Sequence, residues 1–83
     1  MPQRLVIAEW WDSFARDLLP NGVSSAQKTE MRRAFYAGSQ ATFHGVMRSL
    51  SSGEGVTEED MKFMANLELE LAQFRKDVRN GKA

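Results

Sequence analysis

The sequence predicts an all-α protein, a three-helix bundle built on a long antiparallel helical hairpin. Two observations support this fold class. Apolar residues recur at steps of three and four in three separate segments, and turn-forming or helix-capping residues stand between those segments. We expect helices near residues 3–19, 25–50 and 57–80, within one domain that covers residues 1–83. A chain of this size buries only about 60–65% of its surface on folding, so association between chains is an expected source of stability.

The first helical segment is rich in tryptophan. Adjacent residues on a helix project about 100° apart, so one of Trp10 and Trp11 can enter the core while the other lies at its edge or on a neighbouring chain. The alternative is that both cover the core of a small domain. The apolar side of this segment consists of Ile7, Trp10, Trp11, Phe14 and Leu18.

The sequence Pro20-Asn21-Gly22 predicts the end of the first helix and a turn, because proline cannot continue a helix and glycine and asparagine tolerate the left-handed conformation. Ser24 and Gln27 then have the spacing of a capping box, which places the start of the central helix near residue 25.

The central helix carries small residues on one stripe and large apolar residues beside it. Glycine inside a helix costs about 1 kcal/mol relative to alanine, so Gly38 and Gly45 indicate close approach of another helix. The apolar surface exceeds what two further helices cover, which predicts a homo-oligomer, most simply a two-fold dimer. The predicted interface residues are Trp10, Trp11, Gly38 and Gly45.

A polar edge borders the large residues of the central helix and is the candidate binding surface. Arginine suits carboxylate or phosphate, an adjacent aromatic ring can stack on a partner, and glutamine and histidine add directional hydrogen bonds. The alternative is an edge that is charged only for solubility. The candidate residues are Arg32, Arg33, Tyr36, Gln40 and His44.

The third segment follows a polar loop, residues 51–56, and begins at a predicted capping box of Thr57 and Asp60. Its apolar residues have heptad spacing and form a seam, which we expect to pair within the chain against the central helix; pairing between chains is the alternative. The seam residues are Met64, Leu67, Leu71, Phe74 and Val78. The expected buried residues are Phe35, Met47, Met64, Leu67, Leu71 and Phe74.

Composition argues against several functions. The formal net charge is zero, which argues against general nucleic-acid binding, because proteins with that role usually carry a cationic excess. There is no cysteine, no membrane-length apolar run and no signal-peptide pattern, so we expect a cytoplasmic protein with no membrane association. We find no catalytic constellation, metal-ligand cluster or cofactor motif, and we interpret His44, the single histidine, as structural or as part of the polar edge. An enzyme is therefore not expected.

The stretch Glu30 to Gln40, EMRRAFYAGSQ, followed by Phe43 and by residues 57–60, resembles a pattern in small uncharacterised proteins of tailed bacteriophages and prophages. The resemblance implies a small accessory protein in the cytoplasm of an infected bacterium. Many such proteins bind and inhibit a host factor or sequester a small anionic nucleotide signal. A nucleic-acid-binding regulator is the alternative function.

Overall fold

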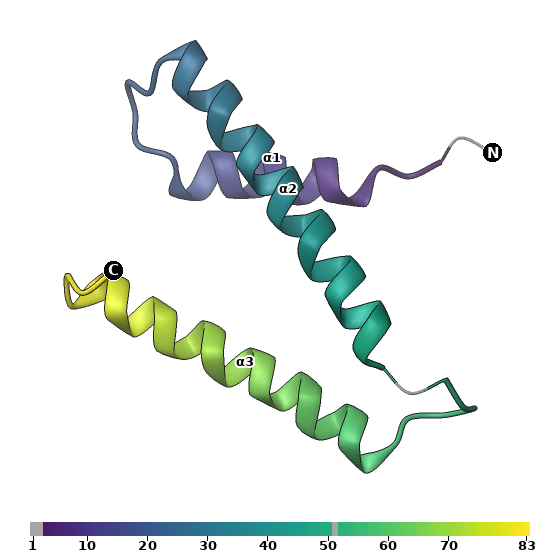
Figure 1. The fold of residues 1–83 in the computed structure, drawn as a ribbon. Helices are drawn as coiled ribbons and strands as arrows, with labels where there is room; N and C mark the ends of the chain where they lie inside the picture. Colours follow the sequence, from purple (N-terminus) through teal and green to yellow (C-terminus); the bar gives the residue numbers. More distant parts are fainter. Residues whose placement is uncertain (1–2, 51) are drawn as a thin grey trace. The chain divides into compact units, whose positions relative to one another are not determined.

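The computed structural model describes residues 3–50 and 52–83 of the chain, and every regular element within them is an α-helix. The helices are α1 (Val6–Leu18), α2 (Ser25–Ser49) and α3 (Glu58–Arg79), as Figure 1 shows. The predicted all-α class and the three helices are confirmed. The chain divides into two compact units, Met1–Gly45 and Val46–Ala83. The antiparallel pairing of α2 with α3 stays a prediction.

In the first unit, α1 packs against α2 through an aromatic cluster of Trp11, Phe14 and Phe35. The centroid of the Phe35 ring lies 5.4 Å from that of Trp11 and 5.3 Å from that of Phe14, and the Trp11 and Phe14 rings are stacked at 5.7 Å. Aromatic pairs at these separations contribute about 0.5–1.5 kcal/mol beyond the burial of their area. Trp11 is only 5% exposed and is the one buried apolar residue in the described part of the chain. The cluster therefore forms the core of this unit.

The connection between α1 and α2 has the predicted turn and cap. α1 ends at Leu18, Leu19 is extended, and Gly22 takes a φ of 89°, a value that favours glycine. The Gln27 backbone N–H donates to Ser24 Oγ at 3.1 Å, and Gln27 Oε1 accepts from the Ser24 backbone N–H at 3.2 Å. These two hydrogen bonds confirm the predicted capping box at the start of α2.

The second unit contains the last turn of α2, a loop and α3. Thr57 Oγ1 accepts a hydrogen bond from the Asp60 backbone N–H at 3.0 Å, and the Asp60 carboxylate accepts one from the Thr57 backbone N–H at 3.2 Å. The predicted capping box of α3 is thus confirmed. At the other end, the N–H groups of Gly81 and Lys82 donate to the carbonyls of Val78 and Asp77, the pattern of a Schellman motif, and Gly81 has a φ of 74°.

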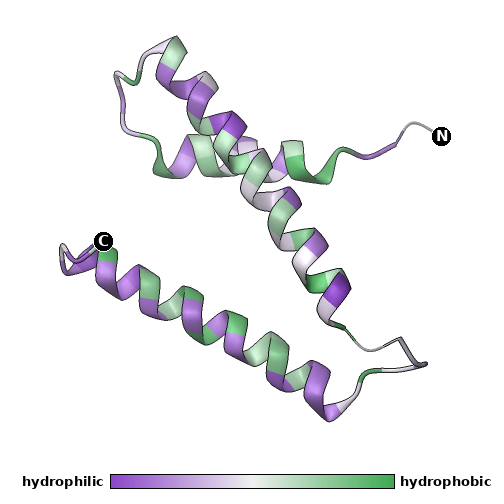
Figure 2. Cartoon of the chain, viewed as in Figure 1, coloured by the Kyte–Doolittle hydropathy of each residue, from purple (hydrophilic) through white to green (hydrophobic). Residues whose placement is uncertain are grey.

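The predicted buried set was wrong for most of its members. Phe35 and Leu67 are half-buried, whereas Met47, Met64, Leu71 and Phe74 are exposed. The physical reason lies in the second unit, which has one complete helix: a helix cannot bury its own apolar stripe without another element to cover it. Figure 2 shows this amphipathic pattern along α3, where hydrophobic and hydrophilic residues alternate around the helix.

Candidate binding groove on the first unit

A groove of about 560 Å³ lies along α2 where α1 packs against it. Three of the five predicted binding residues line it: Arg33, Tyr36 and Gln40. Its other lining residues are Ile7, Ala37, Ser39 and Phe43. We refer to this site as the α2 groove.

Helical spacing and the position of α1 together create the α2 groove. Arg33, Tyr36, Gln40 and Phe43 follow one another at steps of three and four, so they lie along one side of α2. Ile7, in the first turn of α1, adds an apolar wall from the other helix. The groove is apolar at Ile7 and Phe43 and polar at Arg33 and Gln40, so it can contact a partner with both kinds of surface.

Tyr36 is the best-anchored polar residue of the groove. Its half-buried ring lies 6.4 Å from that of Phe35, edge to face, and so joins the aromatic cluster. The Arg32 guanidinium lies over the Tyr36 ring, 4.9 Å from its centroid, which is within the range of a cation–π interaction. Tyr36 also lines a second hollow of about 510 Å³, formed with residues 3–8. The ring is therefore positioned before any partner binds.

Arg33 is available for a partner. Its Nη1 lies 3.5 Å from Glu30 Oε1, and both side chains are 74% exposed. An ion pair so exposed contributes between about 0 and 1 kcal/mol, so an incoming anionic group can compete for the guanidinium at little cost.

The remaining two predicted binding residues lie beside the groove and do not line it. Arg32 reaches the groove only through its contact with the Tyr36 ring. His44 is exposed, and its ring is 5.7 Å from that of Phe43. Sequence reasoning missed Ile7 and Phe43 as site residues. Phe43 could have been found from its spacing with Gln40, but Ile7 joins the site only through helix packing.

The predicted interface residues have different environments. Trp11 belongs to the aromatic cluster, whereas Trp10 is 61% exposed; contact of Trp10 with another chain stays a prediction. The exposure of Trp10 excludes the alternative in which both tryptophans cover the core. A Cβ atom built on Gly38 or Gly45 would meet nothing within 4 Å among the described residues. No helix backbone within residues 3–50 and 52–83 explains these glycines, and their contact with a second chain stays a prediction.

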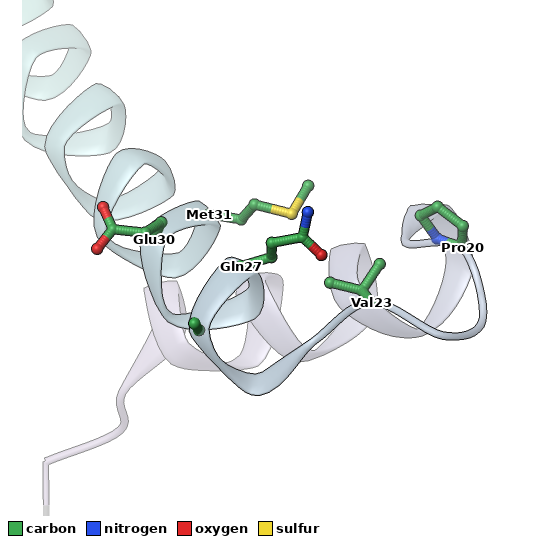
Figure 3. A pocket seen from close by; sticks show the side chains of 6 residues that line it. Pro20, Val23, Gln27, Glu30 and Met31 are labelled. Atoms are coloured by element: carbon green, nitrogen blue, oxygen red, sulfur yellow. The ribbon is translucent and has the colours of Figure 1, made fainter.

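A separate pocket of about 510 Å³ lies at the turn between α1 and α2. Figure 3 shows the Pro20, Val23, Gln27 and Met31 side chains that line it with Ala26 and Glu30. Gln27 is already engaged in the capping box of α2, and most of the other residues labelled in Figure 3 are apolar. This pocket offers fewer directional contacts than the α2 groove, so we treat the α2 groove as the candidate site.

The described residues contain no cluster of three or more histidine or acidic side chains that could hold a metal ion. None of the helices in the described ranges is long and apolar enough to cross a membrane. Comparisons with protein-family models, curated protein sequences and solved structures found no match for this chain.

Proposed function

We propose that this chain is a small non-enzymatic binding module that captures an acidic protein partner in the α2 groove. The observation that carries the proposal is the combination of an exposed guanidinium, a preset tyrosine ring and apolar walls in one groove. A partner would place a carboxylate on Arg33 and an apolar side chain between Ile7 and Phe43. Arginine and aromatic residues are also the types that contribute most to protein interfaces.

The exposure of the groove favours a protein over a small molecule. Sites for small ligands usually bury about 70–90% of the ligand within a concave pocket. Here Arg33 is largely exposed and Phe43 is exposed as well, so the walls would cover only part of a nucleotide. A protein partner would cover the same walls from outside and would keep water from the Arg33 contact.

The resemblance to small bacteriophage and prophage proteins suggests where this partner would be found. An accessory protein of that class would act in the cytoplasm of the host bacterium, and capture of a host protein through an acidic surface would inhibit it. Sequestration of a nucleotide signal and regulation through nucleic acid are the competing functions, and binding measurements with matched variants separate them from protein capture.

The test is affinity capture from bacterial lysate with three baits: the wild-type chain, Arg33→Ala and Arg16→Ala. Arg16 is the matched control because its side chain is 71% exposed, pairs with a neighbouring acid and lies outside the groove. We expect one host protein that the wild type and Arg16→Ala retain and that Arg33→Ala loses by at least about tenfold, the equivalent of one charge-assisted contact.

Equal capture by all three baits would place the binding surface elsewhere. Two parallel measurements address the competing functions: calorimetry with a panel of nucleotides, and mobility shift of random duplex DNA at low and moderate salt. If a nucleotide or DNA binds in a way that depends on Arg33, and no lysate protein is lost on Arg33→Ala, the corresponding alternative would replace the proposed function.

A further inference from the structure

The second unit raises a question that the proposed function does not answer: what covers the seam of α3. Met64, Leu71, Phe74 and Val78 are exposed along this helix, and Leu67 between them is half-buried. In heptad notation, with Met64 at position a, the seam occupies successive a and d positions. The seam lies on α3 alone and shares no residue with the α2 groove.

Charged residues flank the seam at positions e and g, which set partner choice and orientation in coiled coils. Position g carries Glu70 and Asp77, and position e carries Glu68, Arg75 and, just beyond the end of the helix, Lys82. Asp77 accepts a hydrogen bond from Gln73 on the same helix at 3.0 Å, and Glu70, Arg75 and Lys82 form no ion pair with any described residue. These side chains can therefore pair with another helix.

A parallel pair of α3 helices would match these charges. In a parallel coiled coil, a g residue lies near the e residue five positions later in the partner. Glu70 of one copy would face Arg75 of the other, and Asp77 would lie towards Lys82. Each pairing occurs twice across the two-fold axis, and no like charges meet at these positions.

An antiparallel pair of the same helices would not match. In that orientation g residues lie near g residues, and the charged g residues of α3 are both acidic. Any register that aligns the seam then brings Glu70 or Asp77 close to an acid or to Phe63, the third g residue. The favourable approach of Glu68 to Arg75 at the e positions is offset by this repulsion.

We propose that α3 binds a second copy of this chain as a parallel, in-register, two-stranded coiled coil. The occupant of the exposed seam is the same seam in the partner, with Leu71 packing against Leu71 and Glu70 pairing with Arg75. The seam spans only about two heptads, so we expect dissociation in the micromolar to millimolar range, roughly Kd 1 µM to 1 mM.

The first experiment uses the absence of cysteine from the sequence. Val78→Cys places a thiol at an a position. In a parallel, in-register dimer the thiols of the two copies lie close together across the interface. Leu69→Cys is the matched control, because Leu69 lies on the opposite side of α3. Under mild oxidation we expect covalent dimer from Val78→Cys and at least about tenfold less from Leu69→Cys.

The second experiment reverses one charge and measures mass by sedimentation equilibrium. Glu70→Arg should weaken the parallel dimer by about three- to tenfold, because the introduced arginine would then face Arg75 of the other copy. The double variant Glu70→Arg with Arg75→Glu should restore the dimer. In an antiparallel dimer that places Glu70 near Asp77, Glu70→Arg would replace the acidic contact with an opposite-charge pair and strengthen association; in the register that places Glu70 near Glu70 of the other copy, a like-charge contact would remain and association would change little. Weakening by Glu70→Arg together with recovery in the double variant therefore indicates the parallel orientation.

The third experiment compares two leucines of similar exposure on the same helix: Leu71, 62% exposed in the seam, and Leu69, 67% exposed outside it. Leu71→Glu should weaken self-association by at least about a hundredfold, and Leu69→Glu should change it by less than about threefold. Circular dichroism of each variant shows whether the helices are retained. A wild-type chain that stays at its 9.4 kDa mass up to about 1 mM, with no cross-linking of Val78→Cys, would overturn the proposal and favour pairing of the seam with α2 of the same chain.

Discussion

The aromatic cluster of the first unit and the seam of the second unit are both apolar, but they have different environments. Trp11, Phe14 and Phe35 come from two helices that cover one another, and Trp11 is buried as a result. The seam residues of α3 come from one helix and remain largely exposed in the single chain. Heptad spacing alone therefore does not distinguish a core helix from a helix that binds a partner. The difference is whether a second element in the same unit supplies the facing side chains.

Replacing Trp11 by alanine should give the largest effect of any single substitution in the first unit. Removing a buried tryptophan costs about 3–5 kcal/mol, a large part of the stability of a small domain. Trp10→Ala is the matched control, because Trp10 is exposed, and it should change stability by less than about 0.5 kcal/mol. Urea unfolding followed by far-ultraviolet circular dichroism measures both. Equal effects of the two substitutions would show that the aromatic cluster is not the core.

The two capping boxes allow the units to be compared through the same interaction. Thr57→Ala should cost about 1–2 kcal/mol, because it removes the acceptor of the Asp60 N–H, and Asp60 is buried. Ser24→Ala should cost about 0.5–1 kcal/mol, since the cap of α2 is exposed. Thermal unfolding of both variants shows which cap contributes more to stability. A larger loss of stability for Ser24→Ala than for Thr57→Ala would contradict this prediction.

Gly38→Ala tests whether another helix approaches α2. An added Cβ meets nothing within 4 Å among the described residues, so the single chain should gain about 0.5–1 kcal/mol from the better helix former. A loss of stability or of dimer mass would show instead that a second chain packs closely over this position. The measurements are the melting temperature and sedimentation at one fixed protein concentration.

The smallest expected effect concerns the ion pair of Arg4 and Glu9 at the start of α1. Arg4 Nε and Nη2 donate to the two Glu9 carboxylate oxygens, each at 2.8 Å, and these hydrogen bonds lower the pKa of Glu9 below its usual 4.5. Because the folded pKa is depressed, the pair stabilises the fold above pH 4.5, and that contribution disappears as pH falls through the lowered value. Both side chains are exposed, so the effect is small.

Glu9→Gln removes the titrating carboxyl group and should reduce the change of stability with pH in this acidic range. Melting temperatures of the wild type and the variant, measured from about pH 3 to about pH 6, should converge at the acidic end. A difference that stays constant across this range would show that Glu9 acts without its charge.

The helices and their ends could be predicted from the sequence because they depend on local interactions. Capping at Ser24 and Thr57 and the turn at Gly22 involve residues within one or two turns, and all three were found where the pattern placed them. The buried set could not be predicted in the same way, since periodicity identifies an apolar face and gives no information about what covers it. Leu71 illustrates this limit: its spacing is that of a core residue, and its side chain is exposed.

The candidate site was predictable in part for the same reason. Arg33, Tyr36 and Gln40 share one side of α2, which helical geometry fixes, and the structure places all three in one groove. Ile7 joins them because α1 packs against α2, and this contact depends on the aromatic cluster, which brings together residues distant in sequence. The capture experiment is what assigns a partner to the groove.

The fluorescence of the two adjacent tryptophans can report on two different environments in this chain. Trp11 lies among aromatic rings away from solvent, so its indole should emit at shorter wavelength and resist collisional quenching by iodide, whereas the exposed indole of Trp10 should emit at longer wavelength and be quenched readily. Trp10→Phe leaves a fluorophore that reports on the integrity of the aromatic cluster. Trp11→Phe leaves one that reports on the exposed surface of α1 at Trp10, so the spectra of the two variants follow unfolding and surface contact as separate signals.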